Sequence, residues 1–219
     1  MKTRKILITF LILVSIFIAA CGPAKTVLEP TPTSLPTATS LPTSIPGFAK
    51  ISAPGIEIWF PADWEGGDLK NDLEVTVSKL RALGPEFDQI AQMIETNQDA
   101  FVLWLFDSKV SDGGFLTNAN LVKEQVLSAI TLDTYMSSLK SQLPSYMVIT
   151  DQKMVKVGQY DAARVEITMD ISGTKAKELL YIFDHDHTMW TLTFATSEAE
   201  FSSRVPVFEQ IASTFSVQP

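Results

Sequence analysis

Residues 163–171 read Ala-Arg-Val-Glu-Ile-Thr-Met-Asp-Ile, the clearest alternation of apolar and polar side chains in the chain. Successive side chains of a strand point to opposite faces, so this alternation predicts a strand with one buried face. The residues expected to face inward are Val165, Ile167, Met169 and Ile171, and those expected to face outward are Arg164, Glu166, Thr168 and Asp170.

Three further strands are predicted around this one, each separated from the next by a short turn. Residues 147–157 precede it, and residues 178–183, interpreted as apolar on both faces, follow it after Ser172-Gly173. A turn at residues 184–187 leads to a last strand over residues 189–195. Connections this short require antiparallel pairing, so the four strands should form a meander.

Hydrophobic spacing and helix signals predict the remaining elements. Strands are expected over residues 55–60, 100–106 and 118–126. Helices are expected after Asn71, over residues 87–94, from Thr131 to Pro144, and after a Ser197–Glu200 capping box, with Pro206 dividing or kinking the last helix. We therefore expect one α+β domain over residues 48–219, an α/β/α sandwich around a central antiparallel sheet of about six to seven strands.

The first twenty residues have the pattern of an export signal. Lys2, Arg4 and Lys5 precede an apolar run from Ile6 to Ala20. Fifteen residues at ~1.5 Å each reach about 22 Å, which is short of a hydrocarbon core of ~30 Å. Residues 1–20 are therefore expected to be a signal peptide, and a membrane-spanning helix is the weaker interpretation.

The signal ends in Ile18-Ala19-Ala20-Cys21, which resembles the lipobox of exported bacterial lipoproteins. The resemblance implies that the Cys21 sulfur receives a diacylglyceryl group with palmitate-like chains, and that a peptidase cuts before this residue. The chain would then be lipid-anchored at the extracytoplasmic face of the cell membrane, because two acyl chains are enough to keep a protein stably bound to a bilayer. Cys21 is the only cysteine, so lipidation leaves no thiol for disulfides or catalysis. The alternative is an unmodified buried thiol.

Residues 21–47 are rich in Pro, Thr and Ser, and little in them can form a core. They are predicted to be a disordered linker between the lipidated N-terminus and the domain. The formal net charge of the chain is −8, and residues 1–20 hold three of its basic residues and none of its acidic ones. So acidic a surface disfavours nucleic acid as a partner and anionic lipid as an anchor.

Four short motifs between residues 58 and 215 resemble those of PsbP-like domains, a group that includes a photosystem II extrinsic subunit and many bacterial lipoproteins. The motifs are Ile58-Trp59-Phe60-Pro61-x-x-Trp64, Thr131-Leu132-Asp133-x-Tyr135, Val157-Gly158-x-x-x-Ala162-x-Arg164 and Phe208-Glu209-x-Ile211-Ala212-x-x-Phe215. The resemblance covers residues 48–217, with a departure over residues 65–98. It implies an α/β/α sandwich with a non-enzymatic accessory or binding role, and it carries over no catalytic residue.

Two groups of polar residues are candidates for a site. Asp184, His185, Asp186 and His187 hold both histidines of the chain beside two carboxylates, which are ligands that suit zinc or another transition metal. In a hairpin tip the same four residues are only turn formers. Arg164, Glu166 and Asp170, with Thr191 and Thr193 near them, could line a ligand groove, or they could form a solvated face with cross-strand pairs.

Signatures of an enzyme are missing from the sequence. It contains no Gly-x-Ser-x-Gly elbow, phosphate loop or dinucleotide-binding glycine motif. We therefore expect a membrane-anchored extracytoplasmic lipoprotein without a cofactor, whose non-catalytic domain binds or supports an extracytoplasmic protein or a small ligand. The alternatives are a metal-binding domain that uses the Asp184–His187 turn and a carboxylate-based hydrolase.

Overall fold

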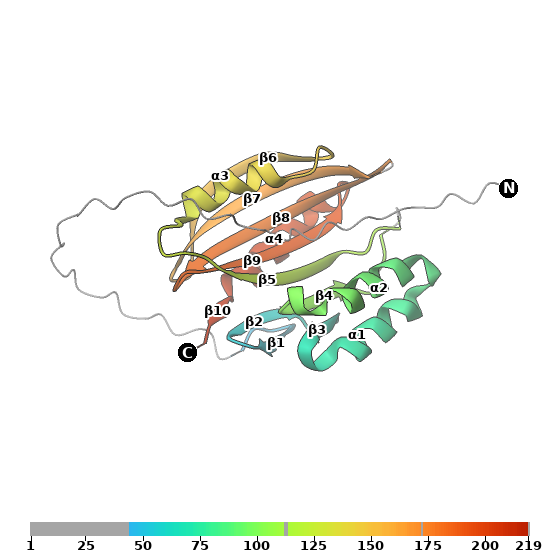
Figure 1. Ribbon diagram of the computed structural model, residues 1–219. Coiled ribbons are helices and arrows are strands. Elements are labelled where there is room, and N and C mark those ends of the chain that lie inside the picture. Colours follow the sequence, from blue (N-terminus) through green and yellow to red (C-terminus); the bar gives the residue numbers. More distant parts are fainter. Residues whose placement is uncertain (1–43, 112–113, 172, 219) are drawn as a thin grey trace, which may run out of the picture.

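The computed structural model describes residues 44–111, 114–171 and 173–218. Its main element is a seven-stranded antiparallel sheet with the strand order β3-β4-β5-β9-β8-β7-β6 (Figure 1). These strands are β3 (Trp64–Asp68), β4 (Leu103–Asp107), β5 (Asn118–Gln125), β6 (Met147–Val157), β7 (Tyr160–Ile171), β8 (Thr174–His185) and β9 (Thr188–Ser197). The signal peptide, Cys21 and most of the linker lie outside the described residues.

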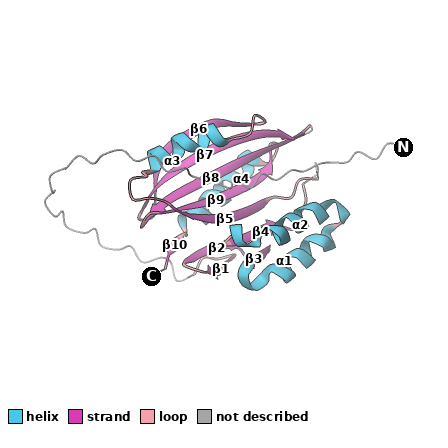
Figure 2. Ribbon diagram, viewed as in Figure 1, coloured by secondary structure: helices cyan, strands magenta, loops and turns pink. Residues whose placement is uncertain are grey.

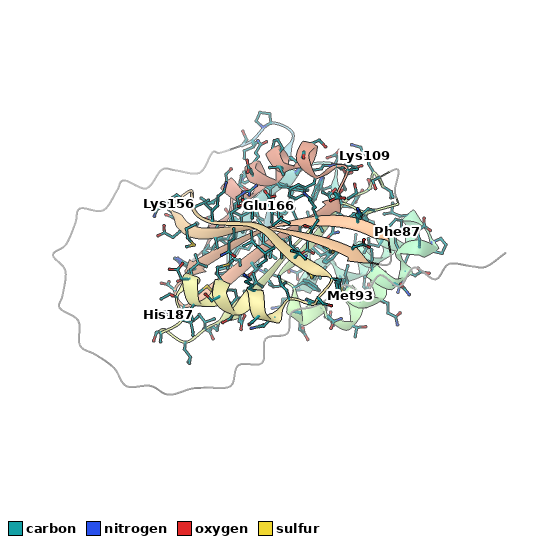
Figure 3. All side chains as sticks on the ribbon, turned by 90° about the horizontal axis from the view of Figure 1, so that it is seen from above. Phe87, Met93, Lys109, Lys156, Glu166 and His187 are labelled. Atoms are coloured by element: carbon teal, nitrogen blue, oxygen red, sulfur yellow. The ribbon has the colours of Figure 1, made fainter. Side chains whose placement is uncertain are left out.

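Among the described residues, a second, three-stranded sheet and four α-helices complete the architecture. The small sheet consists of β1 (Phe48–Ala53), β2 (Ile56–Pro61) and β10 (Ser216–Val217). The helices are α1 (Leu69–Leu83), α2 (Asp88–Thr96), α3 (Leu132–Gln142) and α4 (Phe201–Ser213), with the short 3-10 turns η1 (Pro85–Phe87) and η2 (Gln98–Ala100). Figures 2 and 3 show helices on both faces of the large sheet, with α4 on one face and α3 and α1–α2 on the other. The structure thus confirms the expected α+β sandwich.

The predicted meander is present as β6 to β9. Each of these strands pairs antiparallel with the next, and one β-bulge interrupts β6 between Ile149 and Asp151. The register divides the sheet into two faces. We call the side of Arg164, Tyr181 and Leu192 the α4 face. We call the side of Val165, Leu180 and Thr193 the α3 face.

The α4 face carries the larger core. Phe183 stacks on Phe215 with ring centroids 4.4 Å apart, and Phe194 stacks on Phe208 of α4 at 4.7 Å. The buried residues of β2 join the same cluster. Burial of these rings against the apolar side of the sheet is the main reason that α4 and the small sheet hold their places.

Pro206 does not divide helix α4, which runs unbroken from Phe201 to Ser213 with this proline inside it. The ring of Pro206 is exposed, so water can reach the backbone carbonyl that lacks its usual partner. The capping box is formed only on one side. The Glu200 amide donates to Ser197 Oγ at 3.3 Å, while the Glu200 carboxylate binds Arg204 instead of returning to Ser197.

Three strands and one helix cap were not foreseen. Strands β1, β3 and β10 are short, and β3 contains Gly66 and Gly67, which mask a strand pattern. Gly66 has φ 109°, and a Cβ there would collide with the backbone carbonyl of Trp104. Helix α1 is capped by Asp68, whose Oδ1 accepts from the Lys70 amide at 3.0 Å, and not by Asn71. Thr131 caps α3 as predicted.

Candidate functional site

The α3 face carries a band of polar side chains across the middle of the large sheet, which we call the polar strip. On β9, Thr193 pairs with Leu180 of β8 on one side and with Asn120 of β5 on the other. The next row on the same face runs from Glu178 through Ala195 to Asn118. The polar strip consists of Glu178, Thr191, Thr193, Asn118, Asn120 and Glu124.

The strip lies between two separate apolar clusters of the same face. Helix α3 packs over β7 and β8 through Leu132, Met136 and Leu139. Helices α1 and α2 pack over Trp104 and Phe106 of β4. Figure 1 shows α3 beside β6 and β7 and the α1–α2 pair beside β3 and β4, towards opposite ends of the strand order. The strip residues belong to neither cluster, and all but Asn118 are half-buried.

Glu178 is the most unusual member of the strip. Its neighbours in the cross-strand row are Ile167 and Ala195, which carry no charge. Within the part of the chain that the structure describes, its carboxyl has no hydrogen-bond or ion-pair partner, and burial raises its pKa to about 7. A half-buried carboxyl that has no partner costs folding free energy, so its presence on a sheet face requires an explanation.

Asn118, two strands away in the same row, has a related defect. Its Nδ2 donates to the Leu116 carbonyl at 2.9 Å, and the side chain is 1% exposed. Its Oδ1 is fully buried and has no hydrogen-bond partner among the described residues. Buried polar atoms are nearly always paired, so an unpaired oxygen on the row of Glu178 indicates a missing donor.

The other end of the strip is satisfied internally. The Tyr135 hydroxyl of α3 donates to Glu124 Oε2 at 3.0 Å. Burial, followed by the negative charge of Glu124, holds the pKa of Tyr135 well above its usual range, and Thr191 also interacts with this hydroxyl. The two ends therefore differ: Glu124 has a partner within the fold and Glu178 has none in the described structure.

The predicted ligand groove is wrong, because Arg164, Glu166 and Asp170 do not lie on the same face as Thr191 and Thr193. The register places Arg164 and the two threonines on opposite faces of the sheet. Arg164 is also not solvated: its side chain is 8% exposed, and its Nη1 lies 2.8 Å from Glu166 Oε1. Its Nη2 lies 3.4 Å from Glu209 of α4, so α4 covers a residue that was expected to face outward. Val165, Ile167 and Met169 face inward as predicted.

The Asp184–His187 segment ends β8 and forms the turn to β9. Asp186 and His187 have φ values of 47° and 58°, as a two-residue type I′ turn requires. The His185 ring faces Tyr160 edge-on at 5.7 Å, while His187 sits at the tip of the turn (Figure 3). The two histidines thus do not share a strand face. The described residues bring no three His, Cys, Asp or Glu side chains together in a way that could hold a metal ion.

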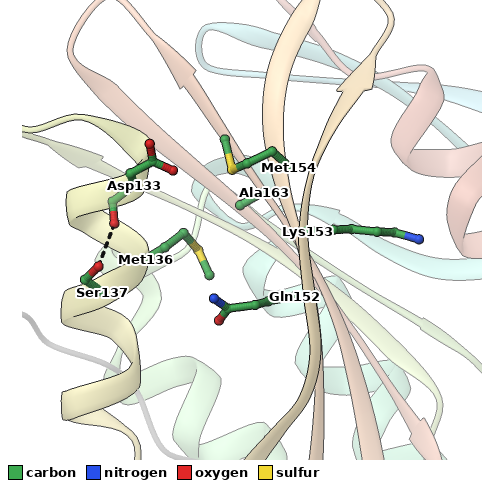
Figure 4. Close-up of a pocket in the computed structure, with 7 residues that line it drawn as sticks. All are labelled: Asp133, Met136, Ser137, Gln152, Lys153, Met154 and Ala163. Atoms are coloured by element: carbon green, nitrogen blue, oxygen red, sulfur yellow. Dashed lines mark hydrogen bonds between the residues drawn. The ribbon is translucent and has the colours of Figure 1, made fainter.

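A separate hollow of about 310 Å³ lies between α3 and the edge strand β6 (Figure 4). The thioethers of Met136 and Met154 form its apolar walls, and the Lys153 side chain points away from it. Ser137 at its rim donates to the Asp133 carbonyl of the same helix at 2.9 Å. With few convergent polar groups, this hollow offers space for contact but little chemistry.

Sequence reasoning missed Glu178 and Asn118. Glu178 was included in a stretch interpreted as apolar on both faces, so its carboxylate was passed over. A signal was nevertheless present, since a carboxylate within a two-sided apolar strand must either meet a partner or remain desolvated. The pairing of Glu178, Ala195 and Asn118 in one row depends on the register of three strands, which the sequence alone does not define.

Comparisons with known proteins indicate a fold. No protein-family model and no curated protein matches the chain. The solution structure of cyanobacterial PsbP (CyanoP) from Synechocystis sp. PCC 6803 is 13% identical, with a TM-score of 0.52, over 82% of this chain and 98% of that one. The chain therefore has the PsbP-like fold, as its motifs suggested.

Two further solved structures are similar over most of their length. LpqN, described as involved in cell envelope biogenesis of Mycobacterium tuberculosis, is 14% identical with a TM-score of 0.47, over 78% of this chain and 91% of that one. The Saccharomyces cerevisiae Ran-binding protein Mog1p is 7% identical with a TM-score of 0.48, over 81% and 96%. At identities this low, function is argued from the site and not from the neighbour. Among the described residues, no helix is long and apolar enough to cross a bilayer.

Proposed function

We propose that the chain is a membrane-anchored extracytoplasmic lipoprotein whose domain binds a partner, a protein or a small ligand, through the polar strip without catalysing a reaction. The export pattern of residues 1–20 and the lipobox ending in Cys21 support the anchor. The Pro/Thr/Ser-rich residues 21–47 would hold the domain away from the membrane.

The observation that carries the binding role is the unpaired row of Glu178 and Asn118 inside the polar strip. Apolar clusters lie on both sides of the strip, so a fold selected only for stability would extend them across it. The strip instead keeps a carboxyl and an amide oxygen without partners in the described structure. Such groups lower the stability of the free protein, and a bound partner that donates to the half-buried Glu178 carboxyl would satisfy it.

The geometry of the strip supports binding over hydrolysis. Its two carboxyls, Glu178 and Glu124, lie in rows six residues apart along β5, which is about 20 Å at ~3.4 Å per residue. Paired carboxylates of glycoside hydrolases stand about 5–10 Å apart. Neither histidine lies in the strip, so no acid–base pair forms there.

The proposed function is tested by photocrosslinking on intact cells. A benzophenone amino acid replaces Asn120 in the strip or, as a matched control, the exposed Gln210 of α4 on the other side of the sheet. We expect an adduct, identified by its mass, from position 120 and none from position 210. Equal labelling from both positions, or labelling from position 210 alone, would show that the strip is not the binding surface.

A further inference from the structure

Strand β6 is an edge of the large sheet, so one side of its backbone has no strand beside it among the described residues. Residues 150–154 of this strand are all exposed. Val157 pairs with Tyr160 across a two-residue turn, which makes them a hydrogen-bonded pair, and such pairs alternate along an antiparallel ladder. The backbone amide and carbonyl groups of Gln152 and Met154 therefore point away from β7, towards the free edge.

The charges on this free stretch complement one another when the strand meets its own copy. Asp151 and Lys153 flank Gln152 and lie on the α4 face, and Lys153 points away from the side chains of Gln152 and Met154 (Figure 4). Among the described residues, Lys153 has no ion-pair partner, and Asp151 reaches Arg164 at 3.6 Å. If two copies of β6 pair antiparallel with Gln152 opposite Gln152, each Asp151 stands opposite a Lys153. Registers centred one residue to either side oppose two aspartates or two lysines, which is unfavourable.

We propose that β6 pairs with β6 of a second copy of this chain, antiparallel about a two-fold axis at Gln152. The added ladder gives the free backbone groups of Gln152 their partners on the second copy. It also places two Asp151–Lys153 pairs across the interface on the α4 face. The same patch is used by both copies, so the contact closes on itself and assembly stops at a dimer.

Two features of β6 that normally keep an edge strand single make this edge selective. Lysine and β-bulges are both common on edges that must not pair. Lys153 repels a partner strand that brings a positive charge opposite it, but in the proposed register it meets Asp151. The bulge between Ile149 and Asp151 bends the strand and limits the contact to about five residues on each copy. An interface of this size is small, so we expect a weak dimer.

The dimer would present both polar strips on one side of a continuous sheet. Its two-fold axis stands perpendicular to the sheet, so the α3 faces of the two copies point the same way. The strip lies on β5, β8 and β9, and β7 separates these strands from β6, so pairing leaves both strips open. A partner with two binding sites would engage both and gain avidity. The dimer itself does not depend on the proposed binding role.

The test is thiol crosslinking on intact cells with Gln152→Cys in the full chain. The proposed register brings the two introduced thiols opposite each other, with Cβ atoms ~5 Å apart, within reach of a short bis-methanethiosulfonate. Cys21 is the only cysteine of the chain, so the unsubstituted protein controls for crosslinks through that residue. We expect a covalent dimer with the mass of two chains from Gln152→Cys. We expect none from Gln210→Cys, which places the thiol on the exposed side of α4.

Charge reversal in the Gln152→Cys background tests the register. Asp151→Lys or Lys153→Asp places like charges opposite each other twice in each dimer. Because an exposed pair contributes a few-fold, each variant should lower the dimer yield roughly tenfold. The double variant, Asp151→Lys with Lys153→Asp, restores opposite charges and should regain the yield. Lys140→Asp makes the same change on the exposed side of α3 and should leave the yield unchanged.

The outcomes that overturn the proposal are distinct. They are no dimer from Gln152→Cys, an equal yield from Gln210→Cys, or a double variant that crosslinks no better than the single ones. A crosslink from Gln152→Cys to a different protein, without a dimer of this chain, would assign the edge to another partner and reject the second copy. Photocrosslinking from position 120 reports on the polar strip alone, so the dimer and the binding role can fail separately.

Discussion

Replacement of Glu178 by Gln should remove a pH-dependent loss of stability from the free protein. The carboxyl has a pKa of about 7 in the folded chain against 4.5 when solvated. At ~1.36 kcal/mol per pH unit, this difference amounts to roughly 3 kcal/mol. This is an upper value, because solvent that reaches the half-buried carboxyl reduces the penalty.

The sign follows from proton binding. Below pH 4.5 the carboxyl is protonated in both states and contributes nothing to the pH dependence. Between pH 4.5 and 7 the unfolded chain loses its proton first, so the folded state binds more protons and its stability falls as pH rises. Above pH 7 both states are ionised and the loss is complete. The Glu178→Gln variant lacks the titrating carboxyl. Its free energy of unfolding, relative to that of the unsubstituted protein, should therefore rise between pH 4.5 and 7.

Urea unfolding followed by Trp fluorescence at intervals from pH 4 to 8, in acetate and phosphate buffers, measures this difference. We expect Glu178→Gln to match the unsubstituted protein near pH 4 and to exceed its free energy of unfolding by up to roughly 3 kcal/mol at pH 8. Asp161→Asn alters an exposed carboxylate that pairs with the exposed Lys156, and it should follow the unsubstituted protein throughout. A difference between Glu178→Gln and the unsubstituted protein that stays constant with pH would refute the reasoning.

Three other predictions concern the anchor and the core. Cys21→Ser should abolish incorporation of labelled palmitate in growing cells, and a persistent label would disprove the lipobox interpretation. Trp190→Ala should lower the free energy of unfolding by ~3–5 kcal/mol, because the ring is 5% exposed and packs near Phe215 at 6.0 Å; a loss under ~1 kcal/mol in urea unfolding would contradict its place in the core. Gly66→Ala should destabilise the protein by more than ~1 kcal/mol, because Gly66 has a φ of 109° and an added Cβ would collide with the Trp104 carbonyl. Gly114 also has a positive φ but has open space around it, so Gly114→Ala measures the backbone effect without the collision.

The meander was predictable because local patterns define it. Alternation over residues 163–171 and short turns force neighbouring strands to pair, and the observed β6 bounds, Met147–Val157, equal those expected. Thr131 caps α3 for a similarly local reason, the hydrogen bond from the Thr134 amide to its side chain. Signals that act within a few residues can thus be taken directly from the sequence.

The site depended on contacts between distant parts of the chain. Alternation shows that Arg164 and Val165 point to opposite faces, but it does not show that α4 brings Glu209 over Arg164. Likewise, Glu178 and Asn118 share a cross-strand row only because β9 lies between β8 and β5 and pairs with both. Residues at such positions follow from the topology of the whole sheet, so sequence reasoning assigned Arg164 to solvent and passed over Glu178.

The most direct test of the binding role is a high-resolution crystal structure of the protein purified from its own membranes. We predict density for a bound group other than water on the polar strip, within hydrogen-bonding distance of the half-buried Glu178 carboxyl. A structure in which the Glu178 carboxyl meets only water, with nothing bound along the strip, would contradict the account.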